Sequence, residues 1–154
     1  MYAVEAVGLT RRFGSLTAVD HVDLAIKPGT IYGFLGSNGS GKSTMIRMLC
    51  GVLTPDEGKG SILGHDIVME QDKIRAQMGY MSQKFSLYPD LTVYENLSFY
   101  AGMYSLKGNE KRERIEAMLD MADLSKRKRE LAGNLSGGWR QRLALGCAIL
   151  HHPK

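Results

Sequence analysis

The nine residues GSNGSGKST, residues 36–44, constrain this chain more than any other stretch of it. They fit the pattern G-x-x-x-x-G-K-[ST], with an apolar run, IYGFL (residues 31–35), before them and good helix formers after them. Backbone N–H groups wrap an anion only where the chain turns sharply without Cβ atoms, which Gly36, Gly39 and Gly41 permit. The pattern therefore predicts a phosphate site between a buried strand at residues 31–35 and a helix.

The side chains of this loop indicate which ligand carries the phosphate. Lys42 places a full positive charge at the start of the helix, where free N–H groups and the helix dipole already favour an anion. The hydroxyl of Ser43 is a hard oxygen ligand of the kind that Mg²⁺ accepts, and Thr44 adds a second hydroxyl. These residues predict a nucleoside triphosphate with Mg²⁺, but kinases, GTPases, helicases and transporters all use such a loop.

A second glycine pair opens another predicted helix near the end of the chain. In LSGGWRQR, residues 135–142, Ser136 is placed to cap this helix, and Gly137 and Gly138 leave its first N–H groups bare. The residues by themselves are equally compatible with a second anion-facing helix start and with a cap that binds nothing.

Composition limits the other possibilities. The chain has 154 residues, 44% hydrophobic and 23% charged, which suits one soluble globular domain or a large piece of one. Its net charge of +4 permits an anionic ligand without requiring nucleic acid. Cys50 and Cys147 lie in apolar surroundings, so we expect two small buried side chains in a reducing compartment. The N-terminus lacks a secretory signal and no apolar stretch reaches the roughly 18 residues of a membrane span, so a membrane role requires a partner.

Three segments in a fixed order carry a family resemblance. GSNGSGKST, SQKFSLYPDLTVYENLSFYA and LSGGWRQRLALGCAILHHP resemble the nucleotide-binding domain of ATP-binding cassette (ABC) transporters, over essentially the whole chain. The middle segment is most similar to the drug- and polysaccharide-export branch. The resemblance implies an α/β P-loop fold of ABC type, with an N-terminal antiparallel β layer, a helical subdomain and a core sheet incomplete at the C-terminus. It divides this partial domain into a strand-rich part with the phosphate loop (1–83), a helical subdomain (84–135) and a signature helix (136–154).

The resemblance also assigns roles at matching positions. Phe13 would stack on adenine, although the family more often has Tyr there and a core Phe is the alternative. Gln83 would be the catalytic glutamine that, with Ser43, reaches Mg²⁺; a polar residue ending a strand at residues 77–83 is the alternative. The signature residues would meet the γ-phosphate held by a second copy in a head-to-tail dimer. The implied ATP-binding residues are Phe13, Gly36, Ser37, Asn38, Gly39, Ser40, Gly41, Lys42, Ser43, Thr44, Ser136, Gly137 and Gly138.

Two features depart from the family pattern. Trp139 stands where the family usually has Gln, and we expect it to pack against the helical subdomain. The family also has an apolar run ending in Asp-Glu, and later a switch histidine, beyond the point where this sequence stops at Lys154. Because phosphoryl transfer needs an oriented nucleophile, we expect this chain to bind nucleotide without turning it over, which leaves its ATPase activity open.

The resemblance implies a function as the ATP-binding subunit of an export-type ABC transporter. Such a subunit would dock through its helical subdomain on a separate transmembrane permease, peripherally on the cytoplasmic face of the membrane. We expect no nucleic-acid partner, although residues 125–130 and the segment around residues 111–114 form a basic cluster. The glutamates interleaved in that cluster favour a solvated helix face; they are Glu110, Glu113 and Glu116. The alternative is a soluble ABC ATPase acting on DNA or ribosomes. A metabolite kinase would leave the LSGG segment unexplained.

Overall fold

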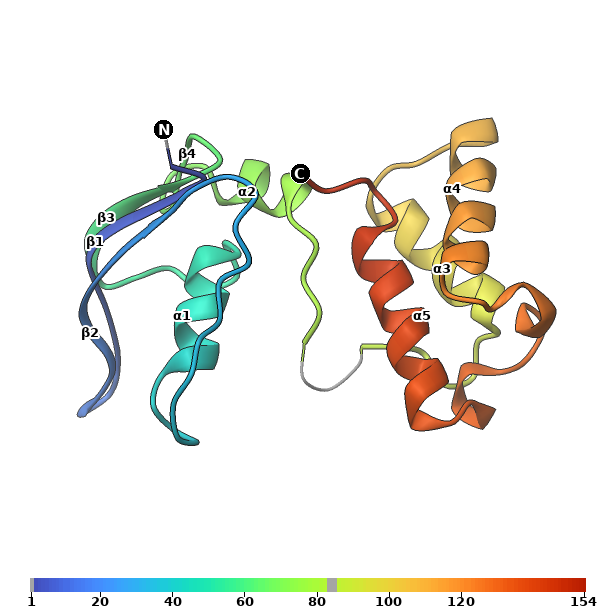
Figure 1. Ribbon diagram of the computed structural model, residues 1–154, viewed down its shortest axis with the longest axis horizontal. Helices are drawn as coiled ribbons and strands as arrows, with labels where there is room; N and C mark the ends of the chain where they lie inside the picture. Colours follow the sequence, from blue (N-terminus) through green and yellow to red (C-terminus); the bar gives the residue numbers. More distant parts are fainter. Residues whose placement is uncertain (1, 83–85) are drawn as a thin grey trace. The chain divides into compact units, whose positions relative to one another are not determined.

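The computed structural model describes residues 2–82 and 86–154, which belong to two compact units, Met1–Gln77 and Met78–Lys154. The first unit is a four-stranded antiparallel sheet in the order β2-β1-β3-β4, with a helix beside it (Figure 1). Its elements are β1 (Val4–Phe13), β2 (Leu16–Ile26), α1 (Lys42–Leu49), β3 (Glu57–Ile62), β4 (His65–Asp66) and α2 (Gln71–Gln77). The antiparallel layer implied by the family resemblance is therefore confirmed.

The end of β2 alternates between partly buried and exposed residues, as a half-buried strand does. Val22, Leu24 and Ile26 are partly buried, whereas the residues between them are exposed. The register shifts near the tip of the hairpin, because Arg11 pairs with Val19 while Arg12 pairs with Thr17. The extra residue on β2 is Ala18, so the strand carries a β-bulge at this point.

Helix α1 packs through one face and is followed by a glycine. Met45, Met48 and Leu49 are buried. Gly51 follows the helix with a φ of 65°, the left-handed conformation that commonly closes a helix. Cys50 and Cys147 are both free and buried, as the sequence predicts. Burial raises the pKa of Cys50 to about 11 and the pKa of Cys147 to about 12, so both thiols stay protonated at neutral pH.

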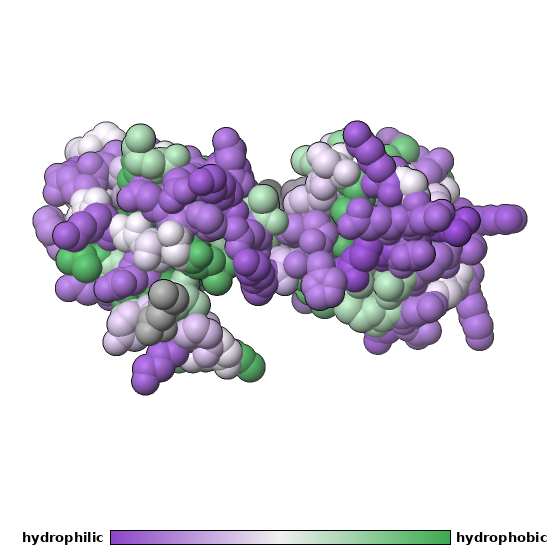
Figure 2. Space-filling model, turned by 90° about the horizontal axis from the view of Figure 1, so that it is seen from above, coloured by the Kyte–Doolittle hydropathy of each residue, from purple (hydrophilic) through white to green (hydrophobic). Residues whose placement is uncertain are grey.

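The strands predicted at residues 31–35 and 77–83 are wrong for the residues that the structure describes. Residues 31–35 and 78–82 have irregular backbone, and Gln77 is the last residue of α2. Ile31 and Leu35 are 101% and 96% exposed. Figure 2 shows apolar surface, in green, among the purple of the hydrophilic surface. A buried parallel strand needs hydrogen-bonded neighbours and covered faces. Within residues 2–82 and 86–154, no strand pairs with residues 31–35.

The second unit is a bundle of helices with its own core. Helices α3 (Val93–Met103), α4 (Gly108–Met121) and α5 (Gly137–Ile149) pack on one another (Figure 1), joined by the short 3₁₀ turns η1 (Ser125–Arg127) and η2 (Ala132–Asn134). The helical subdomain implied by the family resemblance is confirmed. Helical spacing places four apolar side chains of this bundle on one face, and all four are buried: Ile115, Met118, Leu119 and Ala122.

The described residues contain no helix that is both long and apolar enough to cross a membrane.

Candidate functional site

The loop at residues 36–44 has the backbone that its glycines predict. Gly36, Gly39 and Gly41 have φ values of 152°, 83° and 83°, a region that residues with a Cβ rarely adopt. Helix α1 begins at Lys42, as the sequence predicts, and its first N–H groups are free of any side-chain cap in the described part of the chain. The loop therefore presents bare backbone amides at the positive end of a helix.

The loop lies directly against the sheet at the bulge in β2. A Cβ on Gly41 would overlap the carbonyl oxygen of Ala18 and would lie 3.4 Å from a methyl group of Val19. A β-bulge turns a backbone carbonyl away from the regular ladder. The bulge thus brings the start of α1 close to the hairpin that carries Phe13 at its tip (Figure 1).

The Lys42 side chain folds back over its own loop. Its ammonium group donates hydrogen bonds to the carbonyl oxygens of Gly36 (2.8 Å) and Ser37 (2.5 Å) and to the hydroxyl of Ser40 (3.2 Å). A Cβ on Gly36 would lie only 2.8 Å from that same hydroxyl, so the loop closes tightly around the lysine. This arrangement holds one positive charge against the carbonyl oxygens of the loop.

The two hydroxyls after the lysine are placed differently. Ser43 is exposed and Thr44 is half-buried. An exposed hydroxyl at this position suits a ligand of Mg²⁺, which takes few protein oxygens and keeps several waters. Among the described residues, no group of three His, Cys, Asp or Glu could hold a metal ion. The other predicted metal contact, Gln83, lies outside the described residues.

Phe13 is 48% exposed at the end of β1, so the alternative of a core phenylalanine does not fit. The guanidinium of Arg11 lies over its ring, with Cζ 5.0 Å from the centroid. Arg11 in turn donates to the carbonyl oxygen of Thr54 (3.0 Å) and to the carboxylate of Asp56 (2.8 Å). Sequence reasoning missed Arg11, although its position two residues before Phe13 in a strand places both side chains on one face.

The glycine pair of the second unit also begins a helix. Ser136 is the residue before α5, its carbonyl oxygen accepts from the Arg140 N–H at 2.9 Å, and all three signature residues are exposed. The Ser136 side chain was expected to cap the helix, but it makes no capping hydrogen bond within the part of the chain that is described. The N–H groups of Gly137 and Gly138 come before the first intrahelical donor and are left available.

Comparison with known proteins identifies the family of this chain. The model of the family described as "ABC transporter" matches residues 19–154, most of the chain. The chain belongs to the ABC transporter family. Among curated ABC relatives, it is 45% identical over 150 residues to "Probable multidrug ABC transporter ATP-binding protein YbhF" of Escherichia coli (strain K12), covering 97% of this chain and 26% of that protein.

Further relatives agree on the family and the fold. The chain is 34% identical to "Linearmycin resistance ATP-binding protein LnrL" of Bacillus subtilis (strain 168), covering 98% of this chain and 49% of that protein. The solved dimer of the ATP-binding cassette MJ0796, in a post-hydrolysis state bound to ADP and Pi, matches with a TM-score of 0.84 at 31% identity, covering 97% of this chain and 70% of that one. This ABC chain thus spans between a quarter and a half of the two curated relatives.

Trp139, which replaces the usual glutamine of ABC proteins, packs as predicted against the core of the helical bundle. Its ring also contacts two guanidinium groups, with Cζ of Arg127 at 4.8 Å and Cζ of Arg142 at 4.9 Å from the centroid. The exchange for tryptophan therefore serves packing within the second unit and leaves the signature residues exposed.

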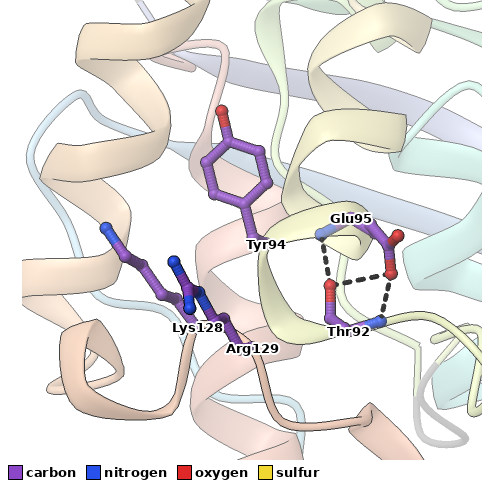
Figure 3. Close-up of a pocket in the computed structure, with 5 residues that line it drawn as sticks. All are labelled: Thr92, Tyr94, Glu95, Lys128 and Arg129. Carbon is purple, nitrogen blue, oxygen red and sulfur yellow. Dashed lines mark hydrogen bonds between the residues drawn. The ribbon is translucent and has the colours of Figure 1, made fainter.

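The ABC helical bundle also contains a pocket of about 330 Å³ at the start of α3 (Figure 3). Thr92 and Glu95 bond to each other there in a capping box, and Lys128 and Arg129 lie to one side of Tyr94. None of the residues that the sequence analysis assigned to ATP lines this pocket. It is a recess on the bundle surface, and none of the signature residues lines it.

Proposed function

We propose that this chain is the ATP-binding part of an export-type ABC transporter. One observation carries the proposal: the loop around Lys42 combines three glycines of positive φ with the uncapped start of α1. The phosphates would lie among the loop amides and take over the Lys42 ammonium from the carbonyls of Gly36 and Ser37. Ser43 would contribute an oxygen to Mg²⁺, Gln83 the second contact to it, and Phe13 a stacking surface for adenine.

A phosphate ladder tests the nucleotide part of this proposal. Titration calorimetry with AMP, ADP and ATP in excess Mg²⁺ should show affinity rising with each phosphate, because the loop is built around anionic oxygens. Equal affinity for AMP and ATP would mean that the loop contributes nothing, and the proposal would fail.

We place the signature residues of one copy on the nucleotide of a second copy. The support is chemical: Ser136, Gly137 and Gly138 are exposed, and the helix behind them offers free amides to an anion. Because each copy carries one loop and one signature, a head-to-tail dimer would contain two identical composite sites.

Mixing two defective chains tests this sharing. Lys42→Ala removes the loop cation and keeps the signature, whereas Gly138→Asp keeps the loop and places a negative charge at the signature. In sedimentation with MgATP, each variant alone should stay monomeric, and their mixture should form a dimer with one intact site. If the wild-type chain dimerises and the mixture does not, the composite site is wrong.

We propose that the second unit docks on a separate transmembrane permease, peripherally on the cytoplasmic face of the membrane. Apolar side chains are exposed along α3, where Phe99 and Met103 lie one helical turn apart. Tyr88 meets Phe99 edge to face, with ring centroids 4.7 Å apart. An apolar surface of this kind is typical of a protein contact.

Co-purification from membranes tests the docking surface. Met103→Asp should abolish recovery of a polytopic membrane subunit with the tagged chain. Met121→Asp is the matched control, because Met121 is also an exposed methionine at the end of a helix in the same unit. Recovery of ribosomes or DNA in place of a membrane protein would favour the soluble class of ABC ATPase.

A further inference from the structure

Arg11 and Phe13 contact each other near the end of β1. The two residues lie two apart on β1, so their side chains leave the same face of the strand. The Arg11 Cζ lies 5.0 Å from the centroid of the Phe13 ring, within the range of a cation–π contact. With the guanidinium over one face, the opposite face of this exposed ring is the one on which a base would stack.

The arginine is itself held in place. Its Nη1 donates to the carboxylate of Asp56 (2.8 Å) and to the carbonyl oxygen of Thr54 (3.0 Å). Asp56 is fixed in turn, because its other oxygen accepts from the Arg12 N–H (2.6 Å) and its own N–H donates to the carbonyl oxygen of Thr10 (2.9 Å). The position of the guanidinium is therefore set by the backbone of β1 and the segment before β3.

The hairpin that carries the ring also contacts the phosphate loop. Phe13 pairs with Leu16 at the hairpin tip, and Ala18, whose carbonyl meets Gly41, is two residues further along β2. Two residues of strand span about 7 Å, a distance that suits the separation of a base from the phosphates of one nucleotide. The bulge at Ala18 thus links the place of the base to the place of the phosphates.

We infer that Arg11 is a positioning residue for the nucleobase. It fixes the Phe13 ring through its covered face, so that the free face meets the purine of a nucleotide whose phosphates occupy the loop. The inference rests on the proposed function, because it requires the loop to bind a triphosphate. It adds that part of the affinity for ATP depends on an arginine that never touches the nucleotide.

The neighbouring arginine provides a matched control. Arg12 leaves the opposite face of β1 and bonds to Glu57 at 2.5 Å, so it has a similar ion pair without a contact to the ring. Binding of MgATP and of inorganic tripolyphosphate with Mg²⁺ should be compared for Arg11→Gln, Arg11→Lys, Arg12→Gln and Phe13→Ala. Tripolyphosphate has no base, so it reports on the loop alone.

The expected pattern is specific to the base. Phe13→Ala should weaken the binding of MgATP about tenfold, because the loss of one base–aromatic stacking contact lowers affinity by about this factor. Arg11→Gln should weaken the binding of MgATP about threefold. Neither should change the affinity for tripolyphosphate, and Arg12→Gln should change neither ligand. Arg11→Gln should cost nothing further in the Phe13→Ala background, because the ring that it positions is gone. Arg11→Lys should weaken MgATP less than Arg11→Gln does, because lysine keeps a positive charge near the ring.

Three results would overturn the inference. If Arg11→Gln weakens both ligands equally, its role is structural or electrostatic, and if it weakens neither, Phe13 needs no support. Losses that simply add in the double variant would also contradict it. Failure of the proposed function looks different, because the wild-type chain would then bind neither MgATP nor tripolyphosphate. Arg11→Lys keeps the test decisive if Arg11→Gln does not fold.

Discussion

A Cβ atom on Gly41 would overlap the carbonyl oxygen of Ala18, so Gly41, the N-cap of α1, packs directly against the backbone of β2. This contact joins the phosphate loop to the bulge at Ala18, one of the places where the register of the hairpin shifts. Two separate reasons therefore favour glycine at position 41. Its φ of 83° is unfavourable for residues with a Cβ, and a Cβ there would have no space.

Gly39 offers a matched comparison, since its φ is also 83° and no described atom lies within 4 Å of a Cβ built there. Gly39→Ala should lower the free energy of unfolding by about 1 kcal/mol, the cost of a left-handed alanine. Gly41→Ala should lower it by about 3 kcal/mol, because the backbone clash adds to the same strain. Urea unfolding followed by circular dichroism measures both, and equal losses would contradict the contact with Ala18.

Asn96 should be among the most sensitive residues of the second unit. It is fully buried in α3; its side-chain oxygen accepts from the Tyr88 N–H (2.9 Å), and its amide donates to the carbonyl oxygens of Tyr88, Leu91 and Thr92. Asn96→Ala should lower the free energy of unfolding by about 3 kcal/mol, because buried polar backbone groups lose their partners.

The exposed asparagine Asn109, in α4, is the control for this substitution. Asn109→Ala should change the free energy of unfolding by less than about 0.5 kcal/mol. If thermal or urea unfolding gave the same loss for both asparagines, the buried network around Asn96 would not stabilise the fold.

Trp139 should be worth more to stability than the glutamine that the family usually has there. Trp139→Gln removes apolar contacts with the core and two cation–π contacts, with Arg127 and Arg142, so the free energy of unfolding should fall by about 2 kcal/mol. Unfolding should be followed by circular dichroism, because the substitution removes the single tryptophan and with it the tryptophan fluorescence signal. An unchanged unfolding midpoint would show that the ring contributes no packing energy.

Protonation of Glu70 should lower the stability of the first unit in acid. Its carboxylate accepts from Lys73 (2.7 Å) and from the Asp66 N–H (2.9 Å), and these bonds lower the pKa of Glu70 from 4.5 to about 2. The stabilisation should be complete above pH 4.5 and should disappear as the pH falls towards 2, where the folded carboxylate takes up its proton. Glu70→Gln should show no such loss. Parallel profiles for the two chains between pH 4.5 and pH 2 would argue against the shifted pKa.

The sequence predicts the helices and glycine loops of this chain well, because their signals are local. Ile115, Met118 and Leu119 are spaced for one helical face, and all three are buried. The same approach fails at Ile31, because an apolar run becomes a buried strand only where neighbouring strands bond to it and cover it.

The contacts around the candidate site were harder to foresee, because they depend on register. Ala18 lies against Gly41 at the point where the register of the hairpin shifts by one residue, between Arg11 and Arg12. The partners that fix Arg11 come from residues 54 and 56, far along the chain, and no periodicity connects them to β1. The sequence therefore predicts the residues of the phosphate loop, while the support of Phe13 emerges only from the fold.

The most direct test of the account is the affinity of the chain for MgATP before and after removal of one ammonium group. Titration calorimetry should show that Lys42→Ala weakens MgATP at least about tenfold, the loss expected for a charge-assisted hydrogen bond. Lys27→Ala, which removes an exposed lysine from a turn in the same unit, should leave the affinity unchanged. Equal affinities for the wild-type chain and Lys42→Ala would contradict the claim that this loop holds the triphosphate.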